Sequence, residues 1–455
     1  HQIQEEFTMY ILTNGRLITR DPDARGYYEK GAVVYEGSKI VEVGEEAALT
    51  AKYPQAEKID AKGGVIMPAL INAHTHIYSA LARGLSIVGN NPTNFLEVLE
   101  GTWWAIDRHL TLEGTRASAD ALYIDCIKQG VTTVFDHHAS YCQIPGSLFQ
   151  IGESAKKFGI RSCLCYEVSD RDGEEKCLEA IRENADWITY CREHNDPMLA
   201  AMFGGHALFT ISDKTFDRMV EANNGRTGYH IHVSEGMNDV YDSLQNYGRR
   251  PVQRLQDHGI LGEKTILGHC IHVNTAEMEL IRETGTMVVN NPESNMGNAI
   301  GICPVLQLYK RGILLGMGTD AYTNDMLESL KVALCSQRSQ NCLPNVGWCE
   351  VTDMLFKNNA KIGEKYFPDT LGVLKADAAA DIIVMDYKPF TPFSDENIDG
   401  HMIFGMTGRQ CQTTIAAGKL LMKDRELVGI DEEAENAHIL EASRKLWGTL
   451  NHREY

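Results

Sequence analysis

Apolar and polar positions alternate on two length scales through the middle of the chain. Short runs rich in apolar and β-branched residues have the length of buried strands, and amphipathic stretches separate most of them. Eight such runs lie at 65–71, 131–135, 160–166, 198–203, 228–233, 264–268, 286–290 and 313–317. Eight strands that alternate with helices are typical of a closed parallel sheet, so the pattern predicts an α/β protein with a (β/α)8 TIM barrel.

The amphipathic stretches carry the end signals of helices. Clear examples are 111–129, 174–193 and 323–338. Thr111 and Ser212 stand where helix N-caps are expected. An open doubly wound sheet is the alternative, but it calls for a Gly-rich phosphate turn after an early strand. The glycines of 295–301 do not match that fingerprint, so we expect a loop there.

Both ends of the chain show a β-rich pattern that differs from the middle. Residues 10–20 and 32–43 are β-rich, and the same character returns between 381 and 424. We therefore predict a small β-sandwich built from the N- and C-terminal segments, whereas residues 1–8 lack the pattern and are left out of the argument. The predicted domains are 9–67 for the first part of the sandwich, 68–375 for the barrel, 376–430 for the second part and 431–455 for a C-terminal helix.

Composition narrows the possible partners. The 455 residues carry a formal net charge of −19, which repels phosphate backbones and anionic lipid, so we expect neither nucleic acid nor a membrane as a partner. No apolar run reaches the length of a membrane span, and we expect a cytoplasmic protein. The 12 cysteines include no Cys-x-x-Cys pair, which favours reduced thiols over a Cys-rich zinc site.

Candidate metal ligands follow the predicted barrel strands, where the working residues of such barrels lie. His74 and His76 come directly after the apolar segment VIMPALINA. Residues two apart in a strand face the same side, so both imidazoles can point into the barrel mouth and bind one ion. Surface histidines would fit poorly in so apolar a context.

Two further strands complete a ligand set. His232 offers a third nitrogen, and Asp320 offers a carboxylate oxygen. Three histidines and one aspartate suit Zn²⁺, with Fe²⁺ as the alternative, and leave a position for water. We therefore predict one divalent metal ion. His230 lies on the same strand face as His232, and spacing alone does not choose between them.

The residues around this set have chemistry suited to hydrolysis. A metal-bound water ionises near neutral pH and becomes a nucleophile, and Asp320 would accept its proton. Glu235, three residues after His232, could protonate a ring nitrogen of a substrate and pass the proton to the leaving group. His269 could hydrogen-bond the attacking water or a developing oxyanion, or serve only as a core histidine.

Two candidates for substrate binding come from aromatic and histidine-rich segments. Trp104, beside Trp103, could stack on a planar heterocycle or simply pack a helix. One residue of the pair His137 and His138 is expected to face the pocket, and we take His138 as the candidate.

Seven segments together resemble the amidohydrolase superfamily, in particular its mononuclear aminohydrolases and chlorohydrolases. They are PALINAHTH (68–76), GVTTVFDHHAS (130–140), GGHALFTISD (204–213), HIHVSE (230–235), LGHC (267–270), NPESNMG (291–297) and GMGTDAY (316–322). Their order and spacing cover most of the chain. The segments DHHAS and IDGHMIFGM (398–406) are most similar to SsnA-type aminohydrolases.

The resemblance implies roles for these residues. It matches His74, His76, His232 and Asp320 to the ligands of one metal, and therefore favours His232 over His230. It matches Glu235 to the proton shuttle, His269 to a histidine that contacts the water or a carbonyl, and His206 to a position that often touches substrate. No lysine stands at the end of the fourth predicted strand, where binuclear relatives carry one, which favours a single metal. A homodimer or larger oligomer is also implied.

The leading hypothesis is hydrolytic deamination of an amino-substituted nitrogen heterocycle such as a purine or pterin, with release of ammonia. Hydrolysis of a cyclic amide or amidine, or of a carbon–halogen bond on a heterocycle, is the alternative within enzymes. A non-catalytic metal-binding or assembly protein is the alternative from another class. The complete set of ligands, base and acid argues against the last of these.

Overall fold

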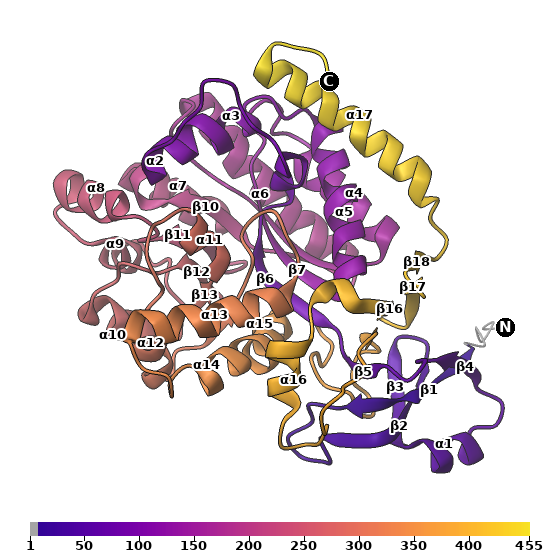
Figure 1. Cartoon of the computed structure of the whole chain (residues 1–455). Coiled ribbons are helices and arrows are strands. Elements are labelled where there is room, and N and C mark those ends of the chain that lie inside the picture. Colours follow the sequence, from indigo (N-terminus) through magenta and orange to yellow (C-terminus); the bar gives the residue numbers. More distant parts are fainter. Residues whose placement is uncertain (1–7) are drawn as a thin grey trace.

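A computed structural model describes residues 8–455 of the chain (Figure 1). Residues 1–7, most of the segment left out of the sequence argument, lie outside the described residues. Within residues 8–455 no helix is both long enough and apolar enough to cross a membrane.

Parallel strands close into a barrel at the centre of the molecule, as predicted. One sheet has the order β6-β7-β8-β9 and the other has the order β10-β11-β12-β13-β14. Only Met202 separates β9 from β10, and a parallel bridge between Thr75 and Asp320 joins the last strand to the first. The strands are β6 (Leu70–Thr75), β7 (Val131–His138), β8 (Arg161–Tyr166), β9 (Leu199–Ala201), β10 (Phe203–Ala207), β11 (Tyr229–Val233), β12 (Ile266–His269), β13 (Met287–Asn290) and β14 (Leu315–Met317).

The predicted first strand, 65–71, is two strands in different sheets. β5 (Val65–Pro68) pairs with the terminal strands β1 and β15, and the chain enters the barrel as β6 only after Ala69. Both strands are buried on all sides, so the apolar run continues without a polar break across the domain boundary. The hydrophobic pattern therefore cannot show where one sheet ends and the other begins.

The two ends of the chain meet in one small domain, as predicted, and this domain is built on a nine-stranded sheet. Its order is β18-β17-β16-β15-β5-β1-β2-β3, with β4 paired to β1. A single apolar cluster includes Leu12 and Val33 from the N-terminal segment and Ile382 and Ile415 from the C-terminal segment. The strands are β1 (Met9–Ile18), β2 (Tyr27–Glu36), β3 (Lys39–Glu45), β4 (Glu57–Asp60), β15 (Ile382–Met385), β16 (Cys411–Ala416), β17 (Lys419–Lys423) and β18 (Glu426–Leu427). The numerical domain boundaries stay predictions.

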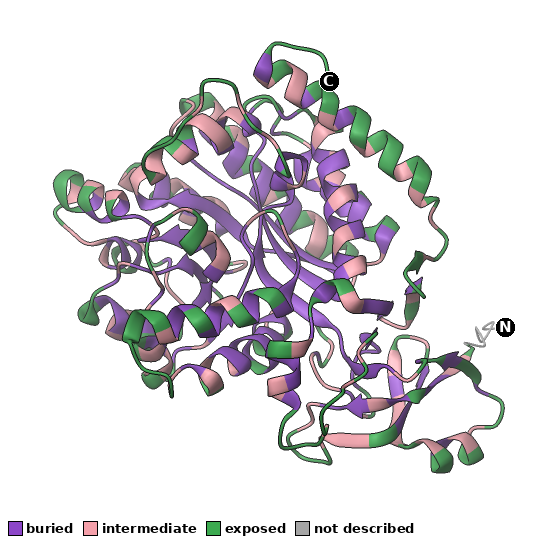
Figure 2. Ribbon diagram, viewed as in Figure 1, coloured by how far each residue is buried: buried purple, intermediate pink, exposed green. Residues whose placement is uncertain are grey.

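Helices surround the barrel and leave its strands in the buried centre (Figure 2). Thr111 caps α4 by accepting from the backbone N–H of Gly114, and Ser212 caps α7 in the same way, as predicted. The expected loop at 295–301 is partly helical, because α11 includes its first three residues. The helices are α1 (Glu46–Lys52), α2 (Phe95–Val98), α3 (Trp104–Asp107), α4 (Leu112–Gln129), α5 (Ser147–Phe158), α6 (Glu174–His194), α7 (Asp213–Asn223), α8 (Met237–Tyr247), α9 (Pro251–Asp257), α10 (Thr275–Thr284), α11 (Pro292–Gly297), α12 (Val305–Lys310), α13 (Met326–Asn341), α14 (Trp348–Asp353), α15 (Asn359–Glu364), α16 (Ile398–Gly405) and α17 (Glu432–Asn451).

A buried ion pair links the barrel to the terminal sheet. Arg161, at the start of β8, is fully buried and pairs with Asp381, which precedes β15. Asp381 also accepts from the Thr132 hydroxyl at 3.1 Å and from the backbone N–H of Ala417 at 2.7 Å. The carboxylate therefore connects three segments that are distant in the sequence.

The C-terminal helix α17 lies against the outside of the barrel (Figure 1). Its Trp447 Nε1 donates to the carbonyl of Leu81 at 2.7 Å. Asn451 accepts from the backbone N–H of Val88 at 2.7 Å and donates to the carbonyl of Ser86 at 2.9 Å. The helix thus holds the segment that leads from the end of β6 to α2.

Candidate metal centre and active site

Strand ends bring the four predicted metal ligands together. His74 lies in β6 and His76 directly follows it, while His232 lies in β11 and Asp320 follows β14. Asp320 has a positive φ of 63° and is held against the first strand by two backbone bonds. Its N–H donates to the carbonyl of His74 at 3.0 Å, and its carbonyl accepts from the N–H of His76 at 2.7 Å.

The ligand atoms of this cluster converge on one small volume. Asp320 Oδ1 lies 3.0 Å from His74 Nε2 and 2.9 Å from His76 Nε2. His76 Nε2 lies 3.2 Å from His232 Nε2. All four candidate ligand atoms lie within 4.8 Å of one another, and all four residues are buried. The structure therefore brings together every residue that the sequence analysis proposed as a ligand.

The outer nitrogens of two histidines fix where their protons are. His76 Nδ1 donates to the carbonyl of His137 at 2.5 Å, and His232 Nδ1 donates to the carbonyl of His206 at 2.8 Å. Each ring therefore turns Nε2 towards the same point, and the two Nε2 atoms lie 3.2 Å apart. With both rings in the neutral form that binds a metal, these nitrogens carry lone pairs that repel each other unless a cation lies between them. The donor set and its outer hydrogen bonds therefore fit a divalent metal ion.

His230 supports the cluster from behind rather than joining it. Its Nε2 lies 2.8 Å from His74 Nδ1, the nitrogen that faces away from Asp320. This contact orients the His74 ring. Burial lowers the pKa of His74 to about 3 and lowers that of His232 well below its usual value, so both rings are neutral and suited to metal binding.

Glu235 and His269 lie beside the ligand cluster. Glu235 Oε1 is 3.3 Å from His269 Nε2, and the same nitrogen is 3.8 Å from Asp320 Oδ1. His269 Nδ1 donates to the side-chain oxygen of Asn295 at 2.8 Å, which fixes the ring. Burial and the charge of Asp320 raise the pKa of Glu235 well above its usual value, which favours the protonated form of this carboxyl.

The second oxygen of Asp320 is also held. Ser294 donates its hydroxyl to Asp320 Oδ2, and the side-chain amide of Asn298 donates to the Ser294 oxygen at 3.2 Å. Asp320 therefore has one oxygen directed to the cluster and one fixed by α11.

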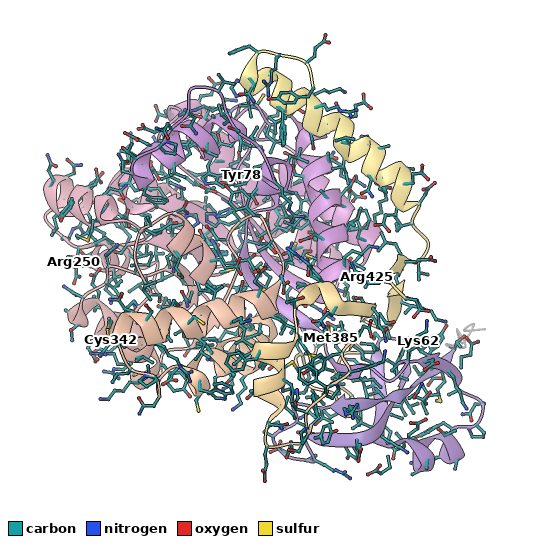
Figure 3. All side chains as sticks on the ribbon, in the orientation of Figure 1. Lys62, Tyr78, Arg250, Cys342, Met385 and Arg425 are labelled. Atoms are coloured by element: carbon teal, nitrogen blue, oxygen red, sulfur yellow. The ribbon has the colours of Figure 1, made fainter. Side chains whose placement is uncertain are left out.

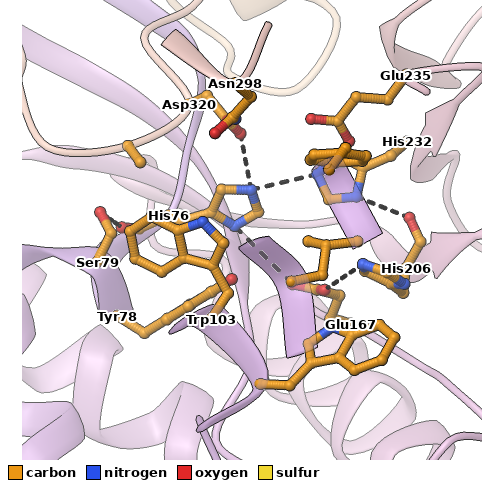
Figure 4. Close-up of a pocket in the computed structure, with 14 residues that line it drawn as sticks. His76, Tyr78, Ser79, Trp103, Glu167, His206, His232, Glu235, Asn298 and Asp320 are labelled. Atoms are coloured by element: carbon orange, nitrogen blue, oxygen red, sulfur yellow. Dashed lines mark hydrogen bonds and ion pairs between the residues drawn. The ribbon is translucent and has the colours of Figure 1, made fainter. Parts of the chain in front are cut away.

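A pocket opens onto this cluster (Figure 4). Tyr78, which is labelled in Figure 3, is one of the residues that line it. Two of the three predicted substrate contacts, His206 and Trp104, line it. Trp104 lies under the guanidinium of Arg171 at 4.8 Å and stacks with Phe209 at a centroid distance of 6.4 Å. The lining residues are His76, Tyr78, Ser79, Phe95, Leu99, Trp103, Trp104, Glu167, His206, His232, Glu235, Asn298, Asp320 and Ala321.

His138, the third predicted substrate contact, does not line this pocket. Its ring is fully buried between Tyr78 and Tyr166, with centroid distances of 6.2 Å and 5.6 Å. His138 Nε2 bonds the hydroxyl of Ser140 at 3.0 Å. Its side chain therefore packs among Tyr78, Tyr166 and Ser140 and not in the pocket, so we assign it no contact with a substrate.

Glu167 is the pocket residue that the sequence analysis missed. It directly follows β8, and its side chain is 3% exposed. Burial acts to raise the pKa of Glu167, but the neighbouring imidazoles of His206 and His137 outweigh it and lower that pKa. Glu167 directly follows the predicted strand 160–166. The sequence analysis chose polar residues at the ends of other predicted strands, and the same criterion could have identified Glu167.

Comparison with known proteins shows which family has this architecture. The amidohydrolase family pattern matches residues 65–421. The chain belongs to the amidohydrolase family. Residues 31–56 also match a composite domain of bacterial imidazolonepropionase-like proteins. No comparison tests the narrower resemblance to SsnA-type aminohydrolases, which stays a prediction.

This amidohydrolase is similar over nearly its whole length to curated deaminases. It is 30% identical to the 5'-deoxyadenosine deaminase of Methanosarcina mazei, covering 97% of this chain and 99% of the relative. It is 29% identical to the 5-methylthioadenosine/S-adenosylhomocysteine deaminase of Thermococcus onnurineus, covering 88% and 91%. A zinc-bound adenosine deaminase from Xanthomonas campestris has the same fold, with a TM-score of 0.85, 22% identity and coverage of 96% and 98%.

Proposed function

We propose that this amidohydrolase is a metal-dependent hydrolytic deaminase of an amino-substituted nitrogen heterocycle such as a purine or pterin. The observation that carries the proposal is the meeting of a candidate cation-binding cluster with the carboxyl of Glu235 at one pocket. Hydrolytic removal of an amino group needs both an activated water and a proton donor. The relatives named as deaminases of adenine nucleosides support the same chemistry.

His74, His76, His232 and Asp320 would hold one divalent ion, for which zinc suits the three nitrogens and one oxygen best and Fe²⁺ is the alternative. Such an ion acts as a Lewis acid and lowers the pKa of a coordinated water towards neutrality. The outer nitrogens of His76 and His232 already donate to carbonyl oxygens, so they are not free to bind a second ion.

The surrounding side chains divide the proton transfers between them. Asp320 accepts the proton of the attacking water, while Ser294 holds its other oxygen in place. Glu235 donates its proton to the ring nitrogen next to the reacting carbon, then takes the hydroxyl proton of the adduct and passes it to the departing amine. The proton held by Asp320 then restores the Glu235 carboxyl. His269, fixed by Asn295, positions the attacking oxygen. One water is consumed, a carbon–oxygen bond forms, a carbon–nitrogen bond breaks, and ammonia leaves.

The aromatic lining suits a planar ring. Trp103, Trp104 and Tyr78 present large apolar surfaces beside the cluster. A heterocycle inserted among them would bury its faces while its polar edge meets His206 and the carboxyl groups. We therefore assign Trp104 and His206 to substrate binding.

The experiment that tests this function joins metal analysis to a screen for ammonia. Purified protein is assayed for bound zinc and iron, and ammonia release is measured from aminopurines, their nucleosides and pterins. We expect about one metal ion per chain and ammonia from at least one compound. Product without ammonia would favour the cyclic-amide or carbon–halogen alternative. Tightly held metal without turnover of any compound would favour the non-catalytic alternative. The cytoplasmic location and the homodimer stay predictions.

A further inference from the structure

Glu167 takes no part in the proton transfers described above, although it lines the pocket. Its carboxylate lies on a different side of the pocket from Glu235, with His232 between them in the view of Figure 4. Both carboxyl groups line the pocket, so Glu167 is available to contact a different edge of a substrate from the one that meets Glu235.

One oxygen of Glu167 is committed to His137. His137 Nε2 lies 2.9 Å from the carbonyl oxygen of Gly205 and 3.0 Å from that of His230, and because carbonyl oxygens only accept, Nε2 carries a proton. His137 Nδ1 lies 3.2 Å from Glu167 Oε2. A single proton between Nδ1 and Oε2 satisfies this contact, whichever of the two atoms carries it. In both cases Oε1 is left as a hydrogen-bond acceptor.

His206 places a donor beside this acceptor. The Thr210 hydroxyl lies 2.7 Å from His206 Nδ1, a contact in which either atom can donate, and 3.3 Å from the carbonyl of Ala207. His206 Nε2 lies 3.4 Å from Glu167 Oε1, and a carboxylate oxygen only accepts, so we place the ring proton of His206 on Nε2. A proton on this nitrogen also avoids two facing lone pairs. Both atoms belong to residues that line the pocket.

We propose that Glu167 and His206 together recognise a cyclic lactam edge, –NH–C(=O)–, next to the carbon that loses its amino group. Glu167 Oε1 accepts from the ring N–H, and His206 Nε2 donates to the ring carbonyl. This inference rests on the proposed deaminase function and specifies its substrate class. The preferred substrate is then a 2-amino-4-oxo heterocycle of the guanine or pterin type.

The chemistry of the ring distinguishes this class from adenine. In a 2-amino-4-oxo ring, the reacting carbon has an imine nitrogen on one side, which suits Glu235 as the proposed proton donor, and an N–H on the other side, which suits Glu167. In adenine, the corresponding second neighbour of the reacting carbon is a carbon atom without a hydrogen to donate. An acceptor left without a donor in a buried pocket costs binding energy, so the pocket disfavours adenine.

The central comparison is between guanine and 1-methylguanine, which differ only at the lactam nitrogen. Zinc-loaded wild-type protein is assayed with guanine, with 1-methylguanine and with 5'-deoxyadenosine, and the same assays are run on Glu167→Leu and Glu167→Gln. Glu183→Gln is the matched control, because Glu183 is equally buried, at 3% exposure, but does not line the pocket. Metal content and thermal unfolding are measured for every variant.

We expect wild-type kcat/KM to be about ten- to a hundredfold higher for guanine than for either other compound, the range for one hydrogen bond to a charged group. Glu167→Leu should remove that preference and leave 1-methylguanine nearly unchanged. Glu167→Gln, which keeps an amide oxygen as acceptor, should be intermediate, and Glu183→Gln should keep the wild-type ratio.

A wild-type ratio near one, or a preference for 5'-deoxyadenosine, would overturn the inference while leaving deamination intact. If Glu167→Leu loses its metal, the wild-type and Glu167→Gln ratios still decide. If no compound releases ammonia, the proposed function fails, and the inference is then judged by calorimetry of xanthine and 1-methylxanthine with zinc-loaded wild-type protein. Tenfold tighter binding of xanthine would support the lactam contact, and equal affinities would refute it.

Discussion

Two histidines on one strand allow the metal assignment to be tested with a built-in control. His230 and His232 both lie in β11 and are both buried, yet only His232 directs a nitrogen into the cluster. His232→Ala removes one of four proposed ligands. His230→Ala removes only the partner of His74 Nδ1, a contact of 2.8 Å. Loss of such an outer partner typically weakens metal affinity ~10–100-fold, or about 1.4–2.7 kcal/mol.

The assay is a competition between protein and a chromophoric chelator for zinc, followed by elemental analysis of the dialysed protein. We expect His230→Ala to keep its metal after dialysis, with affinity reduced within the range above. His232→Ala should lose affinity by more than that range and emerge from dialysis without stoichiometric metal. If the two variants lose metal equally, or if His230→Ala loses more, the choice of His232 as ligand is wrong.

Three further changes test other parts of the molecule. Glu235→Gln keeps the shape of the side chain but cannot transfer a proton, so kcat should fall ~10²–10⁴-fold while metal content is unchanged, and full activity would refute the acid assignment. Asp381→Asn removes the closer of the two carboxylates that pair with the buried Arg161, in the link between the barrel and the terminal sheet, and leaves only Asp369 at 3.6 Å. This should destabilise the fold by up to about 3–5 kcal/mol, and an unchanged thermal midpoint would contradict it. Burial raises the pKa of Glu183 to about 7, so the folded chain binds a proton that the unfolded chain releases near pH 4.5, and stability falls as pH rises through this window. Glu183→Gln should flatten that part of the pH dependence of the thermal midpoint, by up to about 3 kcal/mol, and an identical dependence in both proteins would show that the carboxyl is not perturbed.

Barrel strands and helix caps could be predicted because each depends on local sequence. Eight buried apolar runs are long enough to show the period of a strand, and Thr111 and Ser212 cap helices through bonds to residues three positions away. The split between β5 and β6 could not be predicted, because Pro68 and Ala69 lie inside one apolar run and only the pairing partners of each strand differ.

The candidate metal ligands could be predicted from the sequence for a related reason. Histidine and aspartate are conspicuous directly after apolar strands, and the closed barrel brings such strand ends to one place. The same reasoning did not identify the orientation of His138, because its neighbour His137 is the residue of the pair that contacts Glu167. Which of two consecutive side chains faces the barrel interior depends on strand register, and register is fixed by partners elsewhere in the chain.

The bonds from α17 to residues 81–88 give the last part of the chain a role in the order of folding. The metal cluster can assemble once β14 and Asp320 have formed, but the segment that carries Phe95 and Trp104 to the pocket is anchored by Trp447 and Asn451. During synthesis on a ribosome, the substrate site would therefore be completed only when residue 451 has left the exit tunnel. A nascent chain halted before that point could already bind zinc, yet it would hold its substrate loosely.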